Sequence, residues 1–151
     1  MLGRLTADEV EAMLACETVG RIGCHADGRT YVVPIMYAYD RGSVIGVSTD
    51  GLKLHMMRKN PTVCFEVDSA HDLSNWRSVI AWGRFEELSG ADADQAMASF
   101  VARFAPIATG AGFGRTPKDI THQYRAQTDG LRAIVYRIRL TETAGRYEIS
   151  S

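Results

Sequence analysis

The chain has 151 residues, of which 46% are hydrophobic and 23% are charged, as in ordinary globular proteins. This length fits one domain, which we expect to cover residues 1–151. The formal net charge of −1 gives no general attraction to nucleic acid or anionic membranes, so neither is predicted as a partner. The apolar runs are too short to span a bilayer and the first residues do not resemble a signal peptide, so a cytoplasmic protein is predicted.

The first elements are a helix followed by strands. Thr6 and Glu9 form a capping box, which predicts a short amphipathic helix ending at about Cys16. The sequence then becomes alternating and rich in β-branched and aromatic residues, with a hairpin turn signal at Asp27-Gly28. The segment from Val19 to Thr49 therefore predicts three successive antiparallel strands.

Pro34 lies in the middle of the second of these strands. A proline cannot donate a hydrogen bond to a neighbouring strand, so the strand is expected to be bulged or to lie at a sheet edge. Alternatively, the sheet is open at this point and its backbone groups face a ligand. The sequence alone leaves both interpretations open.

The second half of the chain contains two more predicted helices. The first is expected from Leu52 to Lys59, because Asn60-Pro61 ends it. The remaining predicted elements are strands at 62–68 and 76–88, a helix from 90 to about 104, a glycine-rich loop at 105–117 and a strand at 131–142.

The strand at 76–88 places Trp76, Ser78, Ile80 and Trp82 on one face. About six strands, interrupted by short helices and without a βαβ rhythm, indicate a closed or split antiparallel barrel with flanking helices. We therefore predict a mainly β fold.

The turn Ser48-Thr49-Asp50-Gly51-Leu52-Lys53 is the strongest candidate for a ligand site. The first N–H groups of a helix lack intrahelical partners and favour an anion, and Gly51 leaves room for one. Ser48 and Thr49 add hydroxyl donors, and Lys53 adds a full positive charge. These features predict a phosphate site. The alternative is that Asp50 only caps the helix and Lys53 is solvated.

Other candidate motifs are weaker. The glycine-rich stretch 108–114 follows a helical pattern, whereas a dinucleotide fingerprint follows a strand, so a lid or a plain connection is expected there. The four histidines show no metal-ligand spacing, and no metal site is predicted. No nucleophile lies beside His25 or His71, so no catalytic residues are assigned.

The stretch from Val19 to Asp68, with its G-x-K and NP-x-V-C-F-E-V-D elements, resembles a known family when it is followed by the NWRSVIAWGRFEEL segment. It resembles the pyridoxamine 5′-phosphate oxidase-like, FMN-binding split barrels, and within them the branch with the nitroimidazole-resistance proteins. The resemblance covers roughly Leu5 to Leu88 and the final strand. It implies a six-stranded antiparallel split barrel that forms a homodimer and binds one FMN per subunit.

The resemblance also implies which residues contact the cofactor. The strand containing Val32, Val33, Pro34, Ile35 and Met36 would lie along the isoalloxazine ring, with its backbone groups at the polar edge of the ring. The turn with Ser48, Thr49 and Lys53 would hold the phosphate and ribityl chain. Trp76 and Ser78 match positions near the flavin that are reached across the dimer interface.

The sequence departs from the oxidase itself at two places. Gly51-Leu52-Lys53 replaces the serine-arginine-lysine phosphate triplet, so one cation is missing unless Arg29 or another arginine supplies it. The C-terminal arginine-histidine element that grips pyridoxal phosphate is not recognisable in residues 136–151. Pyridoxamine phosphate is therefore not the expected substrate.

The first functional hypothesis is an FMN-dependent oxidoreductase that reduces a small nitroaromatic or quinone-like substrate with a nicotinamide donor. The second is a binding protein on the same barrel that holds flavin or haem without rapid turnover. A haem would need an axial ligand such as His55, His71 or His122. A third possibility is a deazaflavin-dependent reductase.

Overall fold

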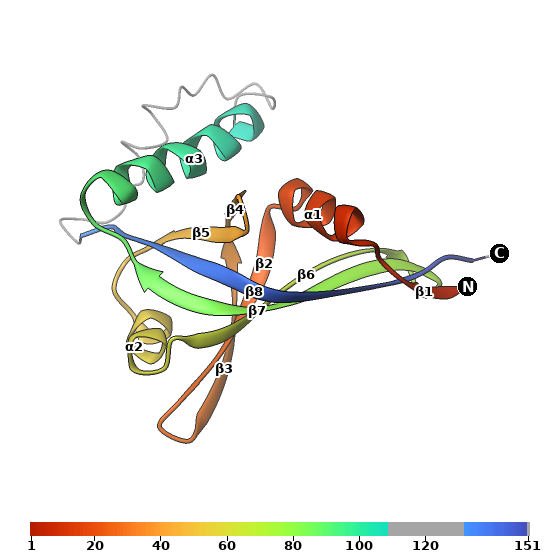
Figure 1. Ribbon diagram of the computed structural model, residues 1–151, viewed down its shortest axis with the longest axis horizontal. Helices are drawn as coiled ribbons and strands as arrows, with labels where there is room; N and C mark the ends of the chain where they lie inside the picture. The colour runs from red at the N-terminus through yellow and green to blue at the C-terminus, as the bar shows by residue number, and fades with distance from the viewer. Residues whose placement is uncertain (109–131, 151) are drawn as a thin grey trace.

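The computed structural model describes residues 1–108 and 132–150, and Figure 1 shows how its elements are arranged. The strands are β1 (Leu2–Arg4), β2 (Val19–Ala26), β3 (Arg29–Met36), β4 (Ala38–Asp40), β5 (Ser43–Ser48), β6 (Thr62–Asp72), β7 (Asn75–Glu87) and β8 (Ile134–Glu148). The helices are α1 (Ala7–Cys16), α2 (Leu52–Lys59) and α3 (Gly90–Ala108). None of these helices is long and apolar enough to cross a membrane.

The strands of the described residues form one eight-stranded sheet with the order β3-β2-β6-β7-β8-β5-β4, and β1 pairs with β8. Every pairing is antiparallel. The mainly β fold with flanking helices and the split-barrel type are confirmed. The predicted number of six strands is wrong, because the short strand β1 was not predicted and the short strand β4 was not separated from β3.

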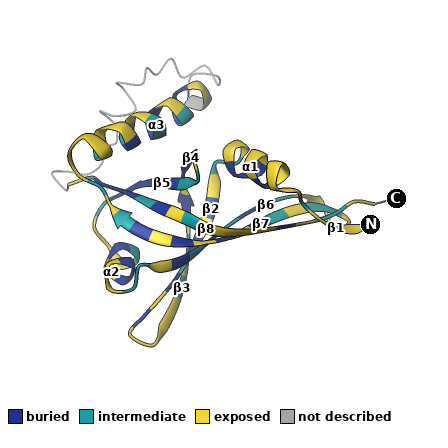
Figure 2. Ribbon diagram, viewed as in Figure 1, coloured by how far each residue is buried: buried dark blue, intermediate teal, exposed yellow. Residues whose placement is uncertain are grey.

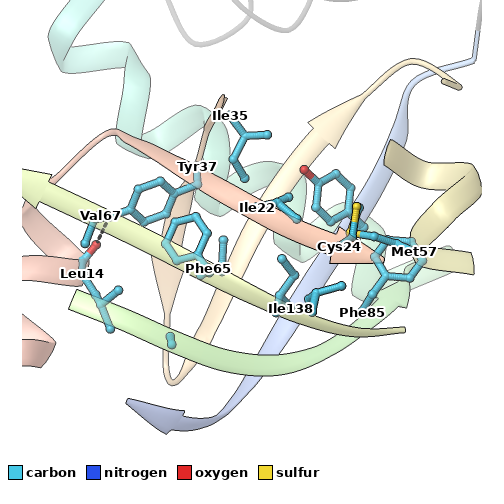
Figure 3. Packing of buried hydrophobic residues seen from close by; sticks show 14 of the residues in the cluster. Leu14, Ile22, Cys24, Ile35, Tyr37, Met57, Phe65, Val67, Phe85 and Ile138 are labelled. Atoms are coloured by element: carbon cyan, nitrogen blue, oxygen red, sulfur yellow. Dashed lines mark hydrogen bonds between the residues drawn. The ribbon is translucent and has the colours of Figure 1, made fainter. Parts of the chain in front are cut away.

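The segment from Val19 to Thr49 is not three successive antiparallel strands. It forms two hairpins, β2-β3 and β4-β5, which lie at opposite ends of the sheet order. The chain leaves the first hairpin at Tyr37, which is fully buried and stacks edge-on against Phe65 at 4.9 Å between ring centroids. The Tyr37 hydroxyl donates to the backbone oxygen of Leu14 at 2.6 Å (Figure 3). Helix α1 therefore anchors the chain at the point where it passes from β3 to β4.

The helix ends follow the local sequence signals. The Thr6 hydroxyl accepts from the Glu9 N–H, and the Glu9 carboxylate accepts from the Thr6 N–H, so the predicted capping box is confirmed. Helix α2 has the predicted bounds and ends at Lys59, with Asn60 as its C-cap residue. Helix α3 extends to Ala108, beyond the expected end, and β8 runs to Glu148.

Two apolar clusters hold the elements together. The larger cluster fills the inside of the curved sheet and includes Ile22, Phe65 and Ile138, with Leu14 from α1 and Met57 from α2 (Figure 3). The smaller cluster lies between α3 and strands β4, β5 and β8. Buried and exposed positions alternate along β2 and β7, so this part of the sheet keeps a second, outward face, whereas β5 is buried from Val44 to Ser48 (Figure 2).

Candidate functional site

The turn between β5 and α2 leaves the start of the helix open. Gly51 is the N-cap residue of α2, and no side chain caps the helix. A Cβ built at Gly51 would meet nothing within 4 Å, so space lies in front of the turn. The first N–H groups of α2 therefore point to a region that an anion can reach.

Lys53 and Ser48 meet beside this turn. The Lys53 ammonium donates to the Ser48 hydroxyl at 2.7 Å, and the Ser48 hydroxyl donates to the Thr49 carbonyl oxygen at 2.8 Å. Ser48 is buried and Lys53 is partly buried. Burial lowers the pKa of Lys53. In the described part of the chain, Lys53 makes no ion pair with a carboxylate. A partly buried cation without a counter-anion favours an anionic ligand.

Asp50 does not cap the helix, so this part of the alternative interpretation is wrong. Its Oδ1 accepts from the Gly51 N–H at 3.1 Å and from Arg58 Nη1 at 2.9 Å. Arg58 also pairs with Glu87 at 2.9 Å, and the hydrogen bond to Glu87 is the main cause that raises the pKa of Arg58. The charge of Arg58 is therefore compensated by two carboxylates, unlike that of Lys53.

A hollow of about 240 Å3 lies next to this ion-pair group, and Arg132 lines it together with Ile134. Ile134 is the register partner of Ser48, so Arg132 enters the sheet close to the turn. Arg132 is exposed and makes no ion pair with any described residue. The sequence analysis did not single it out, because the predicted strand at 131–142 contains it and its closeness to the turn depends on the pairing of β5 with β8. Arg29, the cation named from sequence, lies instead at the β2-β3 turn opposite Ala26.

Strand β3 lies at one end of the sheet, which confirms the edge-strand interpretation of Pro34. Val32 and Met36 are 63% and 55% exposed, whereas Ile35 is 8% exposed and points into the core with Val33 beside it. Thus the side chains of Val32, Pro34 and Met36 share the outward face of the strand.

The backbone of β3 presents hydrogen-bonding groups at its open edge. The Tyr37 N–H donates to the Thr18 carbonyl oxygen at 3.1 Å, continuing the register in which Met36 pairs with Val19. Along a strand of an antiparallel pair, successive residues direct their N–H and C=O groups alternately toward the partner strand and away from it. Because those of Tyr37 point toward β2, those of Val32, Pro34 and Met36 point away from β2. Pro34, which has no N–H, occupies one of these positions and breaks no bond of the ladder.

Trp76 and Ser78 do not meet Lys53 within one chain. They lie at the start of β7, where the Trp76 indole N–H donates to Glu148 at 3.0 Å. Glu87, near the other end of β7, reaches α2 through Arg58. From Trp76 to Glu87 the strand runs for about 35 Å, at about 3.3 Å per residue, which is longer than an FMN molecule.

The outward face of the sheet carries an apolar patch. Its large exposed members are Val19, Val32, Met36, Ile80 and Trp82. The register joins them into adjoining rows, in which Val32 pairs with Gly23, Gly23 with Cys64 and Cys64 with Trp82. Sequence analysis named Ile80 and Trp82 only as members of one face of their strand. The signal available there was that apolar residues occur on both faces of that strand.

The other candidate groups remain dispersed. His55 and His71 are exposed, and His122 and the glycine-rich loop after residue 108 lie outside the described residues. No group of histidines, cysteines and carboxylates suited to a metal ion occurs within residues 1–108 and 132–150.

The described residues form a mainly β split barrel with an uncapped helix start at α2 and an open edge strand, β3. The chain belongs to the pyridoxamine 5′-phosphate oxidase family, whose model matches residues 6–147. The predicted family is thereby confirmed. A related protein from Rhizobium meliloti is 31% identical over 84 residues, and the match covers 56% of this chain and 56% of the related protein's length.

Solved structures show the same fold. An FAD-binding protein from Mesorhizobium loti has a TM-score of 0.78 and 26% identity, and the match covers 99% of this chain and 98% of that one. A candidate 5-nitroimidazole antibiotic resistance protein from Bacteroides thetaiotaomicron has a TM-score of 0.73 and 16% identity, and the match covers 97% of this chain and 87% of that one. The flavocytochrome Anf3 from Azotobacter vinelandii has a TM-score of 0.66 and 18% identity, and the match covers 97% of this chain and 68% of that one.

Proposed function

We propose that the protein is a homodimeric, cytoplasmic flavoprotein that binds FMN and reduces a small nitroaromatic or quinone-like substrate with a nicotinamide donor. The observation that carries the flavin assignment is the Lys53–Ser48 pair beside the open start of α2. This pair offers a positive charge, a hydroxyl and free backbone N–H groups to one phosphate. Family membership agrees with this assignment.

The residues of the turn fit a phosphate monoester. In the proposed complex, Lys53 and Ser48 bind the phosphate oxygens and the N–H groups at the start of α2 complete the contacts. Arg132 supplies the second cation that the Gly51-Leu52-Lys53 sequence lacks. Charge-assisted hydrogen bonds of this kind fix the phosphate and so set the position of the rest of the cofactor.

The open edge of β3 fits the polar side of the isoalloxazine ring. Val32 and Met36 offer backbone N–H groups there, and the carbonyl groups of Val32, Pro34 and Met36 offer acceptors. When bound, the flavin supplies the hydride and electron transfer. The chain orients the ring and sets which of its polar atoms are hydrogen-bonded, and this role needs no strong acid or base from the protein.

A homodimer brings the separated site residues together. The apolar patch around Ile80 and Trp82 on the outward face is the kind of surface that marks a protein interface. Pairing of two such faces would bury it and carry Trp76 and Ser78 of one subunit toward the flavin of the other. Arg21 pairs with Glu66 at 3.0 Å and with Asp68 at 2.8 Å, and so compensates one of these two negative charges within this face.

FAD is the second candidate cofactor, because the Mesorhizobium loti protein with 26% identity is named as FAD-binding. In FMN the group at the α2 turn is a terminal phosphate monoester, whereas in FAD it is a diphosphate that continues to an adenosine. The monoester concentrates its negative charge on one phosphate, which fits a turn with two cations and a helix start.

An absorbance spectrum of the purified protein, followed by titration with FMN, FAD and riboflavin, tests the proposal. We expect flavin bands or saturable quenching of flavin fluorescence, with FMN bound most tightly. If FAD binds more tightly than FMN, FAD is the cofactor instead of FMN. A protein that binds none of the three flavins would contradict the proposal. A haem spectrum lost on changing His55 or His71 to alanine would support the haem alternative. Binding of a deazaflavin alone would support the third hypothesis, a deazaflavin-dependent reductase.

A further inference from the structure

A cleft of about 570 Å3 lies between α1 and the neighbouring ends of β6, β7 and β8. Small-molecule sites in proteins usually enclose roughly 300 to 1,000 Å3, so this cleft has the size of a ligand site. None of the residues proposed for the flavin phosphate lines it, although Trp76, which is proposed to approach the flavin of the partner subunit, does. Figure 1 shows α1 and α2 well apart, although both pack against the larger apolar cluster.

One wall of the cleft is a single face of α1. Its residues follow the spacing that brings side chains together on a helix, namely Glu9, Ala12, Met13, Cys16 and Glu17. The opposite wall includes Trp76 and Ile149. The hydrogen bond from the Trp76 indole N–H to Glu148 fixes the ring, so the cleft has a preformed aromatic surface.

Carboxylates outnumber cations in the lining of the cleft. Three carboxylates line it, from Glu9, Glu17 and Glu148, against the Arg77 guanidinium and the His71 imidazole. Just outside the lining, Arg103 donates to the Cys16 carbonyl oxygen and the N-terminal ammonium donates to that of Ile149. Glu9 accepts from the Thr6 N–H and Glu148 accepts from Trp76, and both hydrogen bonds leave the negative charges in place. Glu17 makes no ion pair with the residues that the structure describes.

We infer that this cleft binds a small organic cation with an apolar body, of the aromatic or alkyl ammonium class. Met13 and Ile149 would contact the apolar part, and the carboxylates would attract the charged group. A cation over the indole face of Trp76 gains a cation–π attraction in addition. The same carboxylates would repel an organic anion of equal size.

Fluorescence of Trp76 gives a direct test, because the chain has two tryptophans. The variant Trp82→Phe leaves Trp76 as the only indole, and Trp82 is not part of the cleft. The purified variant is titrated with benzyltrimethylammonium, with neutral benzyl alcohol and with benzoate, at low and high salt. We expect saturable quenching by the cation, at least about tenfold tighter than by benzoate and weakened by salt. No saturation, or equal affinity for all three probes, would overturn the inference.

Two carboxylate variants in the Trp82→Phe background locate the binding. Glu17→Gln removes a charge of the cleft, and we expect the affinity for the cation to fall about three- to fivefold, as for a partly solvated ion pair. Glu142→Gln removes an exposed carboxylate of β8 outside the cleft and is expected to change nothing. Equal effects of the two variants, or no effect of either, would contradict a site in this cleft. Because Trp76 is also proposed to approach the flavin of the partner subunit, these titrations use flavin-free protein, so that their outcome is separate from that of the flavin titration.

Discussion

Lys53→Ala removes the cation that the α2 turn directs at the proposed flavin phosphate. The Lys53 ammonium donates to Ser48 at 2.7 Å and has no carboxylate partner within the described residues, so the variant leaves no acid unpaired. A hydrogen bond to a charged group contributes about 1.5–3 kcal/mol. This corresponds to an increase of about 10- to 150-fold in the Kd for FMN.

Quenching of flavin fluorescence measures this change at equilibrium. The matched control is Lys59→Ala, because Lys59 lies on the same helix but pairs with Asp27 at 2.8 Å, outside the turn. Riboflavin is the matched control ligand, since it has the isoalloxazine ring and ribityl chain without the phosphate. We expect Lys53→Ala to weaken FMN and to leave riboflavin unchanged, and Lys59→Ala to affect neither.

Two results would refute this reasoning. If Lys53→Ala leaves the FMN affinity unchanged, the phosphate does not bind at the α2 turn. If riboflavin and FMN lose affinity equally, Lys53 acts on the ring or on the fold instead of the phosphate. Thermal unfolding of the variant separates the last two possibilities, because a folding defect lowers the Tm.

Three further predictions concern the interface and the core. Ile80→Glu places a charge in the apolar patch, where Ile80 is 43% exposed, and should yield a monomer in sedimentation analysis that has lost flavin; a variant that stays dimeric would argue against this interface. Tyr37→Phe removes the hydrogen bond to the Leu14 carbonyl and should lower the free energy of unfolding by about 1–3 kcal/mol in urea titration, whereas an unchanged value would show that this bond does not anchor the crossing. Gly20→Ala puts a Cβ 2.2 Å from the buried Phe65 ring and should cost about 1–3 kcal/mol in the same assay; wild-type stability would mean that the ring moves freely.

Local signals in the sequence predicted the helices well. The capping box at Thr6 and Glu9 and the Asn60-Pro61 stop involve residues only a few positions apart, so the pattern contains the whole interaction. The end of α3 was less well predicted, because the helix passes through Pro106. A proline normally marks an early end for a helical pattern.

Strand pairing could not be predicted to the same degree. Residues 30–40 look like one continuous strand, and only the burial of Tyr37 against Phe65 and Leu14 divides them into β3 and β4. These partners lie far from Tyr37 in the sequence, so no local pattern contains them. The edge position of Pro34 was predictable, because a missing N–H restricts where a strand can lie.

The candidate site was predicted in part. Ser48 ends β5 and Lys53 lies in the first turn of α2, so the short turn between them is enough to predict that they are close. The structure brings them together. The role of Asp50 depends on Arg58, and the place of Arg132 depends on the pairing of β5 with β8, so neither was accessible from the sequence. The separation of Trp76 from the turn likewise depends on the whole length of β7.

The most direct test of the central claim is a crystal structure of the protein with FMN. We predict phosphate density within hydrogen-bond distance of Lys53 Nζ and Ser48 Oγ at the start of α2, with the isoalloxazine ring along Val32 to Met36. Density for the phosphate elsewhere, with Lys53 still bonded only to Ser48, would contradict the account.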